Sequence, residues 1–191
     1  LKSFINYDSK CSLHIHLGNI SYSPKKLISI YSLFQRLQED LNLLIAPYKK
    51  DYQYLYDKQK DHCQNLPLIN DISIQKISEL LGITESNITD KNLFKNTSKW
   101  NLKGRYYTVN FLNYMCRNFP NNTIEFRSLQ MTLNFNYFLT WLIINISIVN
   151  YATKHTNKVL NKKSKIQNED TLTALIEDKV ILQKVLYNYN Y

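Results

Sequence analysis

The sequence predicts an α+β fold, in which short strands and amphipathic helices share one core. Residues 12–18 and 123–129 alternate polar and apolar side chains, which is the pattern of a half-buried strand. Residues 24–46 and 133–152 instead carry apolar side chains in the pattern of helices. With 191 residues, of which 44% are hydrophobic, the chain is long enough for one domain with its own core.

The first predicted strand, residues 12–18, carries two histidines. Successive side chains of a strand point to opposite faces, so His14 and His16 share one face and lie about 7 Å apart. Imidazoles bind metal ions and transfer protons near neutral pH, which makes this face a candidate site. We expect the strand to lie at the centre of the sheet. Its other face points into the core and carries Leu13, Ile15 and Leu17.

A long amphipathic helix is predicted after this strand. Ser23 is a typical N-cap and Pro24 suits the first helical position, so the helix begins there and closes before Pro47. We expect its apolar stripe to pack on the apolar back of the sheet. The stripe recurs at three- and four-residue spacing and comprises Leu27, Ile30, Phe34, Leu37, Leu41 and Leu44.

Residues 70–95 are expected to form a helical insertion. A short helix ends at Gly82, and a second helical turn follows around residues 86–88. This pattern is similar to a DNA-binding helix-turn-helix. However, the second helix would carry Glu85 and Asp90, which repel phosphates, so a plain helical hairpin is the preferred interpretation.

Two further strands are predicted in the second half of the chain. Residues 104–111 place Arg105 on the same face as Tyr107 and Val109. In residues 123–129, Glu125 and Arg127 share one face. The alternative for these two residues is a cross-strand or surface ion pair with no ligand. The other side chains of the second run can pack: Ile124, Phe126 and Leu129.

The C-terminal half is predicted to be helical. Residues 133–152 are mostly apolar, and their longest run is too short to span a bilayer with confidence, so we expect a buried helix with Trp141 in the core. A lysine- and asparagine-rich linker follows at 155–167, and residues 172–187 show a second amphipathic pattern. The predicted organisation is therefore a domain at 1–154 and a linker with a helical appendage at 155–191.

Composition bounds the partners and the compartment. The net charge of +9 suggests an anionic partner such as nucleotide phosphate or RNA, although scattered lysine usually forms a solvated surface. Asn, Ile, Lys and Tyr are abundant, which indicates an AT-rich genome, organellar genomes included. The cysteines Cys11, Cys63 and Cys116 form no metal motif and no disulfide framework. An intracellular, reducing compartment is expected, with the mitochondrion as one candidate.

The order of motifs resembles the amidoligase family of carboxylate–amine ligases, distant relatives of glutamine synthetase. That order is a Cys-x-x-His-x-His-x-Gly strand, a long helix, an Arg-Tyr-x-x-x-Asn strand, a Thr-x-Glu-Phe-Arg strand and a Trp-bearing apolar helix. The resemblance covers about residues 10–152. The matching residues are Cys11, His14, His16, Gly18, Arg105, Tyr106, Asn110, Thr123, Glu125, Phe126, Arg127, Thr132, Leu133 and Trp141, followed by Tyr151 and Ala152.

The resemblance implies a curved antiparallel sheet with helices behind it and an ATP site on the concave face, as in the catalytic core of glutamine synthetase. It also implies a two-step reaction. A substrate carboxylate attacks the γ-phosphate of ATP, and an amine or ammonia then displaces phosphate from the acyl phosphate. Transfer of this kind depends mainly on positioning and on charge stabilisation by metal and arginine.

By the same resemblance, His14 and Glu125 would hold Mg²⁺ or Mn²⁺, and His16 would contact nucleotide phosphate or substrate. Arg127 and Arg105 would hold the transferring phosphoryl group or the substrate carboxylate. These roles suit the residue types, because carboxylates are hard oxygen ligands, imidazole favours Mn²⁺ over Mg²⁺, and guanidinium binds oxyanions through a planar fork.

The sequence departs from the family pattern upstream of the histidine strand. Family members carry a Glu-x-Glu strand there, whereas the only acid before Cys11 is Asp8. Three explanations stay open: the chain is incomplete, a partner chain completes the site, or the activity is lost. The alternative function is therefore a catalytically silent structural subunit of an organellar assembly, such as a mitochondrial ribosome or respiratory complex. It would have RNA or protein partners and need neither ATP nor a metal ion.

Overall fold

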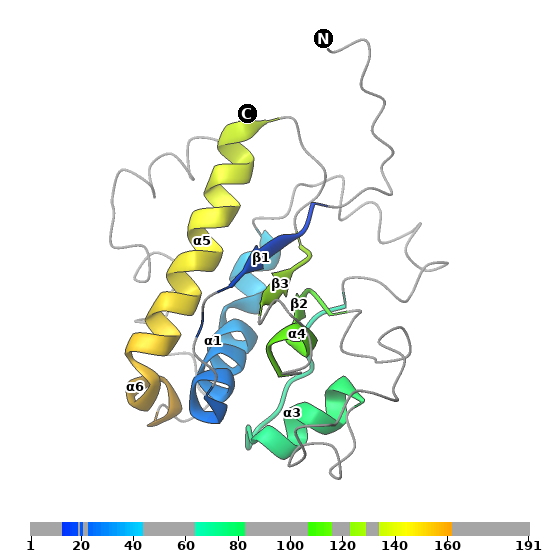
Figure 1. Ribbon diagram of the computed structural model, residues 1–191, viewed down its shortest axis with the longest axis vertical. Coiled ribbons are helices and arrows are strands. Elements are labelled where there is room, and N and C mark those ends of the chain that lie inside the picture. The colour runs from blue at the N-terminus through cyan, green and yellow to red at the C-terminus, as the bar shows by residue number, and fades with distance from the viewer. Residues whose placement is uncertain are drawn as a thin grey trace.

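The computed structural model describes residues 13–18, 20, 23–43, 64–82, 107–115, 123–128 and 134–161. They form an α+β fold with a small antiparallel sheet and surrounding helices (Figure 1), as the sequence predicts. The elements, in chain order, are β1 (Ile15–Leu17), α1 (Pro24–Leu43), α3 (Ile74–Leu81), β2 (Val109–Asn110), α4 (Leu112–Met115), β3 (Ile124–Phe126), α5 (Phe135–Lys154) and α6 (Thr156–Asn161).

The described sheet has the strand order β1-β3-β2, and both pairings are antiparallel. The expectation that the histidine strand is central is therefore wrong among these strands, because β1 lies at an edge and β3 lies in the middle. On the far side of β2, Gln64 forms a parallel bridge with Tyr107, and the backbone N–H of Thr108 donates to the carbonyl of Gln64 at 2.7 Å.

The apolar face of the sheet packs against α1. Ile15 pairs with Phe126 across β1 and β3, and Val109 pairs with the same Phe126 across β2 and β3. The centroid of the Phe126 ring lies 5.2 Å from that of Phe34 on α1. Phe34 and Leu41 also line one pocket with Val109 and Phe126 of the sheet, which confirms that this helix packs on the apolar face of the sheet. Leu44 and the predicted end of the helix at residues 44–46 lie outside the described residues. The predicted stripe is buried throughout its described part: Leu27, Ile30, Phe34, Leu37 and Leu41.

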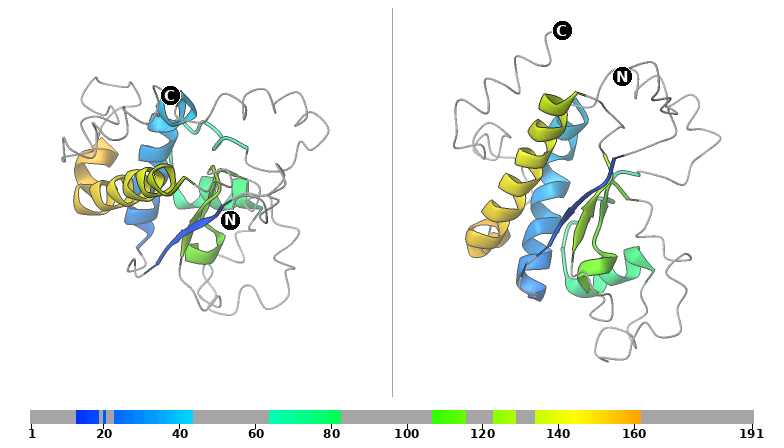
Figure 2. Two further views of the ribbon diagram at one scale, coloured as in Figure 1. Left: turned by 90° about the horizontal axis from the view of Figure 1, so that it is seen from above. Right: turned by 45° about the horizontal axis from the view of Figure 1, so that its top comes forward.

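Helix α1 is buried on more than one side. It begins at Pro24 as predicted, with the N–H of Leu27 donating to the carbonyl of Ser23 at 3.0 Å. Tyr31 and Leu33 are also buried, although the sequence pattern did not include them. The ring of Tyr31 packs on that of Phe111, with centroids 5.8 Å apart, and its hydroxyl donates to the carbonyl of Pro67 at 2.8 Å. Helices α5 and α6 pack against another side of α1 (Figure 2).

Two glutamines of α1 hold the segment around Leu66 and Ile69 by hydrogen bonds to its backbone, as a neighbouring strand would. The side chain of Gln38 accepts from the N–H of Leu66 at 2.6 Å and donates to the carbonyl of the same residue at 3.3 Å. Gln35 makes the equivalent pair with Ile69, with both distances 3.2 Å. An amide side chain has one acceptor and two donor hydrogens, so each glutamine satisfies both backbone groups of one residue.

Helix α5 is the predicted apolar helix. It starts after Asn134, whose side chain accepts from the N–H of Tyr137 at 3.2 Å, and Trp141 is in the core with 2% of its surface exposed. Among the described helices, α5 alone is long and apolar enough to cross a membrane by length and composition. Its buried side packs on α1, which is equally typical of a core helix, so it is weak evidence for a span.

The ends of two other predicted segments are also defined. Helix α3 ends at Gly82, which adopts a left-handed conformation with φ 78° and donates to the carbonyl of Glu79, as expected. Residues 83–95, which include the second turn of the helix-turn-helix interpretation, lie outside the described residues.

Where a linker was expected from His155, the structure has α6, whose Val159 is buried. The predicted helix at 172–187 lies outside the described residues.

Candidate metal and oxyanion site

The candidate site is a row of polar side chains on the face of the sheet opposite to α1. The register pairs His16 with Glu125 across β1 and β3, and it pairs Asn110 with the same Glu125 across β2 and β3. Directly paired residues have side chains on the same face. Because the period of a strand is two, the adjacent row of Ile15, Phe126 and Val109 points to the core and fixes this polar row on the other side.

Glu125 is the centre of the site. Its side chain is only 7% exposed, and its Oε1 lies 2.8 Å from Nδ1 of His14, 2.9 Å from Nε of Arg127 and 3.8 Å from Nε2 of His16. Its Oε2 accepts a hydrogen bond of 2.8 Å from Nδ2 of Asn110. A buried carboxylate requires such partners, because an unpaired buried charge is strongly unfavourable.

These contacts decide the charge of Glu125. Burial raises the pKa of a carboxyl group, but the hydrogen bond from His14, the charge of Arg127 and the hydrogen bonds from Asn110 and Arg127 together lower the pKa of Glu125 to about 2. Glu125 is therefore ionised at neutral pH, which is the form that binds a cation.

Three of these side chains can converge on one metal ion. Their donor atoms, one from each of His14, His16 and Glu125, all lie within 4.8 Å of one another. Bonds of about 2.1 Å to one ion place ligand atoms about 3.0–3.4 Å apart, so small side-chain rotations bring the three together. Nδ1 of His14 would then give its lone pair to the ion instead of donating its N–H to Glu125. The donor set fits one divalent cation.

His16 has a second contact on the side away from Glu125. Its Nδ1 lies 3.4 Å from the hydroxyl of Thr123, and Nδ2 of Asn113 lies 3.5 Å from the same hydroxyl. Both are long for hydrogen bonds and therefore weak. Oδ1 of Asn113 is buried without a hydrogen-bond partner among the described residues.

The structure brings together four of the five predicted site residues: His14, His16, Glu125 and Arg127. The predicted alternative for Glu125 and Arg127, an ion pair, also forms, but within one segment and largely shielded from solvent, since the side chains of Arg127 and Glu125 are 11% and 7% exposed. Arg105 lies outside the described residues. The two residues expected on its face of the strand, Tyr107 and Val109, are buried in the core.

Sequence reasoning gave Asn110 no role, although it belongs to the Arg-Tyr-x-x-x-Asn motif. Alternation along the strand would have placed Asn110 opposite Val109 and therefore on the polar face. The sequence signal for this role is weak, because the strand end does not alternate between buried and exposed residues. All four residues there are buried: Val109, Asn110, Phe111 and Leu112.

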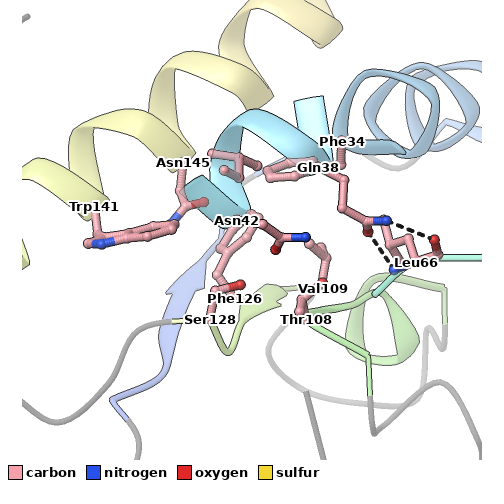
Figure 3. Close-up of a pocket in the computed structure, with 11 residues that line it drawn as sticks. Phe34, Gln38, Asn42, Leu66, Thr108, Val109, Phe126, Ser128, Trp141 and Asn145 are labelled. Carbon is pink, nitrogen blue, oxygen red and sulfur yellow. Dashed lines mark hydrogen bonds between the residues drawn. The ribbon is translucent and has the colours of Figure 1, made fainter. Parts of the chain in front are cut away.

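A separate pocket lies on the opposite, helix-covered side of the sheet (Figure 3). Phe126 contributes to its wall, and Phe34 and Trp141 lie close by. Since Phe126 and Glu125 are neighbours on one strand, they point to opposite faces. This pocket is therefore distinct from the His–Glu cluster. Its polar lining residues are Gln38, Asn42, Thr108, Ser128 and Asn145.

No family model matches the chain, and neither a curated protein nor a solved structure is similar to it. The function is therefore inferred from the chemistry of the site.

Proposed function

We propose that this chain is an ATP-dependent carboxylate–amine ligase domain of the glutamine-synthetase-like type, with a degenerate set of metal carboxylates among the described residues. In this proposal His14 and Glu125 hold a divalent cation, and Arg127 faces the phosphoryl group or the substrate carboxylate. The observation that supports it is the convergence of two imidazoles, one buried ionised carboxylate and one guanidinium on a single face of the sheet.

The charges of the cluster favour an anionic ligand beside the cation. The negative charge of Glu125 and the positive charge of Arg127 cancel when no ion is bound. A bound divalent cation would then leave two net positive charges where the buried Glu125 meets the exposed imidazoles of His14 and His16. Phosphate and carboxylate oxygens are the ligands that compensate such a charge. A bound cation would supply charge neutralisation for these oxygens.

The donor types favour Mn²⁺ over Mg²⁺ as the cation. Mg²⁺ prefers oxygen ligands and keeps several waters, whereas imidazole nitrogen suits transition metals. Among the described residues, Glu125 is the single carboxylate in the cluster and the other two donors are imidazoles. We assign His16 to phosphate oxygens or to the cation itself. Arg105 lies outside the described residues, and only the family resemblance keeps it in the proposal as a second arginine for an oxyanion.

A specific observation favours the second candidate, a catalytically silent structural subunit of an organellar assembly. Both oxygens of Glu125 already have hydrogen-bond partners without a cation. Such a network can be retained for stability alone, without binding any ligand, because removing one partner would leave a buried charge unpaired. In this alternative the basic charge of the chain and the segment 172–187 would contact RNA or protein partners.

Titration of the purified protein with Mn²⁺, followed by electron paramagnetic resonance of the free ion, tests the proposal. Binding of one Mn²⁺ per chain is expected, and Glu125→Gln and His14→Ala should abolish or strongly weaken it. His155→Ala is the matched control, since this histidine lies at the end of α5 and outside the cluster. The structural alternative predicts no saturable Mn²⁺ binding, and that result would overturn the metal-site proposal.

A further inference from the structure

Asn110 has both ends of its side-chain amide engaged. Its Oδ1 accepts from the backbone N–H of Leu112 at 3.0 Å, at the start of α4, and its Nδ2 donates to Oε2 of Glu125 at 2.8 Å. The orientation of the amide follows from chemistry alone, because a backbone N–H can only donate and must face the oxygen. The amide hydrogens therefore face Glu125.

This contact makes the two oxygens of Glu125 inequivalent. Oε2 is held by Asn110, which is 1% exposed, so water does not compete for the bond. Oε1 faces the opposite way, toward His14, Arg127 and His16. Oε2 keeps a second lone pair beside this bond, but the bond fixes the plane of the carboxylate and keeps Oε1 turned toward the two imidazoles.

We infer that Asn110 is a positioning residue that fixes Glu125 as a monodentate ligand, with Oε1 alone facing the cation. This inference rests on the proposed function. It links the backbone at the start of α4 to the metal site through one side chain. Outer partners that orient a ligating side chain commonly change metal affinity about 10–100-fold when they are removed.

The alternative role for Asn110 is purely structural, as an acceptor for the N–H of Leu112. Two variants separate the roles. Asn110→Ala removes both contacts, whereas Asn110→Ser supplies a hydroxyl that can still accept from the N–H of Leu112, two residues on, and is too short to donate to Glu125. Asn145→Ala is the matched control: Asn145 is a buried asparagine with 3% exposure on α5 and lines the pocket on the other side of the sheet.

Two measurements are required. The first is Mn²⁺ affinity: we expect Asn110→Ala to bind Mn²⁺ about 10–100-fold more weakly than the wild type, and Asn145→Ala to bind as the wild type does. The second is the infrared difference spectrum of ¹³C-glutamate-labelled protein on addition of Mn²⁺. The separation between the symmetric and antisymmetric carboxylate bands is wide for monodentate binding and narrower for bidentate binding. We expect a wide separation in the wild type and a narrower one in both Asn110 variants.

The outcomes distinguish this inference from the proposed function. Absence of Mn²⁺ binding by the wild type overturns the proposed function and the inference with it. Wild-type binding with an unchanged carboxylate spectrum in Asn110→Ser overturns the inference alone. If Asn110→Ala does not fold, Asn110→Ser decides the question, because its acceptor for Leu112 preserves the start of α4.

Discussion

The ring of Phe34 on α1 lies 5.2 Å from the ring of Phe126 on β3, measured between centroids, and both side chains are 3% exposed. Phe126 follows Glu125 directly in the chain, so the same strand that holds the carboxylate of the site is anchored to α1 on its other face. The packing of one residue thus limits how far the other can move.

Phe34→Ala should lower the free energy of unfolding by about 3–5 kcal/mol, because it removes a buried aromatic ring and leaves a cavity against Phe126. Chemical denaturation of wild type and variant measures the difference. Phe135→Ala is the control, since Phe135 is 67% exposed and its truncation should change stability by about 0.5 kcal/mol or less. Equal stability of Phe34→Ala and the wild type would show that this face of α1 is not buried.

The stability of the protein should rise with pH between about 2 and 4.5 because of Glu125. Its pKa in the folded protein is about 2, whereas an unfolded glutamate has a pKa of about 4.3. The unfolded chain therefore binds more protons in this window, and the stabilisation is complete above it and lost as the pH falls toward 2. Urea unfolding at a series of pH values measures this dependence.

Glu125→Gln is the comparison for that experiment. The stability difference between wild type and variant should be constant above about pH 5.5 and shrink steadily below pH 4.5, since the variant has no group that titrates there. A difference that is independent of pH from 2 to 7 would contradict the assigned ionisation of Glu125. Measurements without added metal keep the two effects separate.

The sequence predicts much of this arrangement, because period two alone places His14 and His16 on one face of their strand and Glu125 and Arg127 on one face of theirs. It does not predict that β3 lies between the other two strands, since strand order depends on pairing between residues far apart in the chain. The lysine-rich composition after His155 hides α6, whose single buried residue, Val159, packs toward α1. Long-range packing, not local pattern, decides these features.

Arg127→Met should separate cation binding from anion binding. Removal of the positive charge beside Glu125 should leave the affinity for free Mn²⁺ at least as high as in the wild type, because repulsion of the cation falls. We expect inorganic triphosphate to bind the Mn²⁺-loaded wild type only weakly, and the variant to bind it about 10–100-fold more weakly still, the equivalent of one charge-assisted hydrogen bond of about 1.5–3 kcal/mol. Calorimetric titration measures both affinities.

Lys76→Met is the control for Arg127→Met. It also removes one positive charge, but Lys76 pairs with Asp71 at the surface, outside the cluster. Triphosphate binding should be unchanged in this variant. Equal loss of triphosphate binding in both variants would assign the effect to the overall basic charge of the protein rather than to Arg127.

The last prediction concerns ATP itself. We expect the purified chain to bind Mg²⁺–ATP weakly or not at all, and to hydrolyse none of it measurably. The reason is electrostatic: the triphosphate needs cations fixed between its oxygens and protein carboxylates. In the part of the chain that the structure describes, Glu125 is the one carboxylate in the cluster, and the imidazoles of His14 and His16 do not neutralise a divalent ion.

Calorimetry with Mg²⁺–ATP and with Mn²⁺–ATP, together with a phosphate-release assay, tests this expectation. Micromolar binding of either complex that disappears in Glu125→Gln would contradict it and favour an active ligase. Mn²⁺ binding without ATP turnover would fit a degenerate ligase domain whose metal site persists. Absence of both, with co-sedimentation of the chain in a large ribonucleoprotein or protein particle, would favour the structural subunit, because the network around Glu125 would then serve only to satisfy a buried charge.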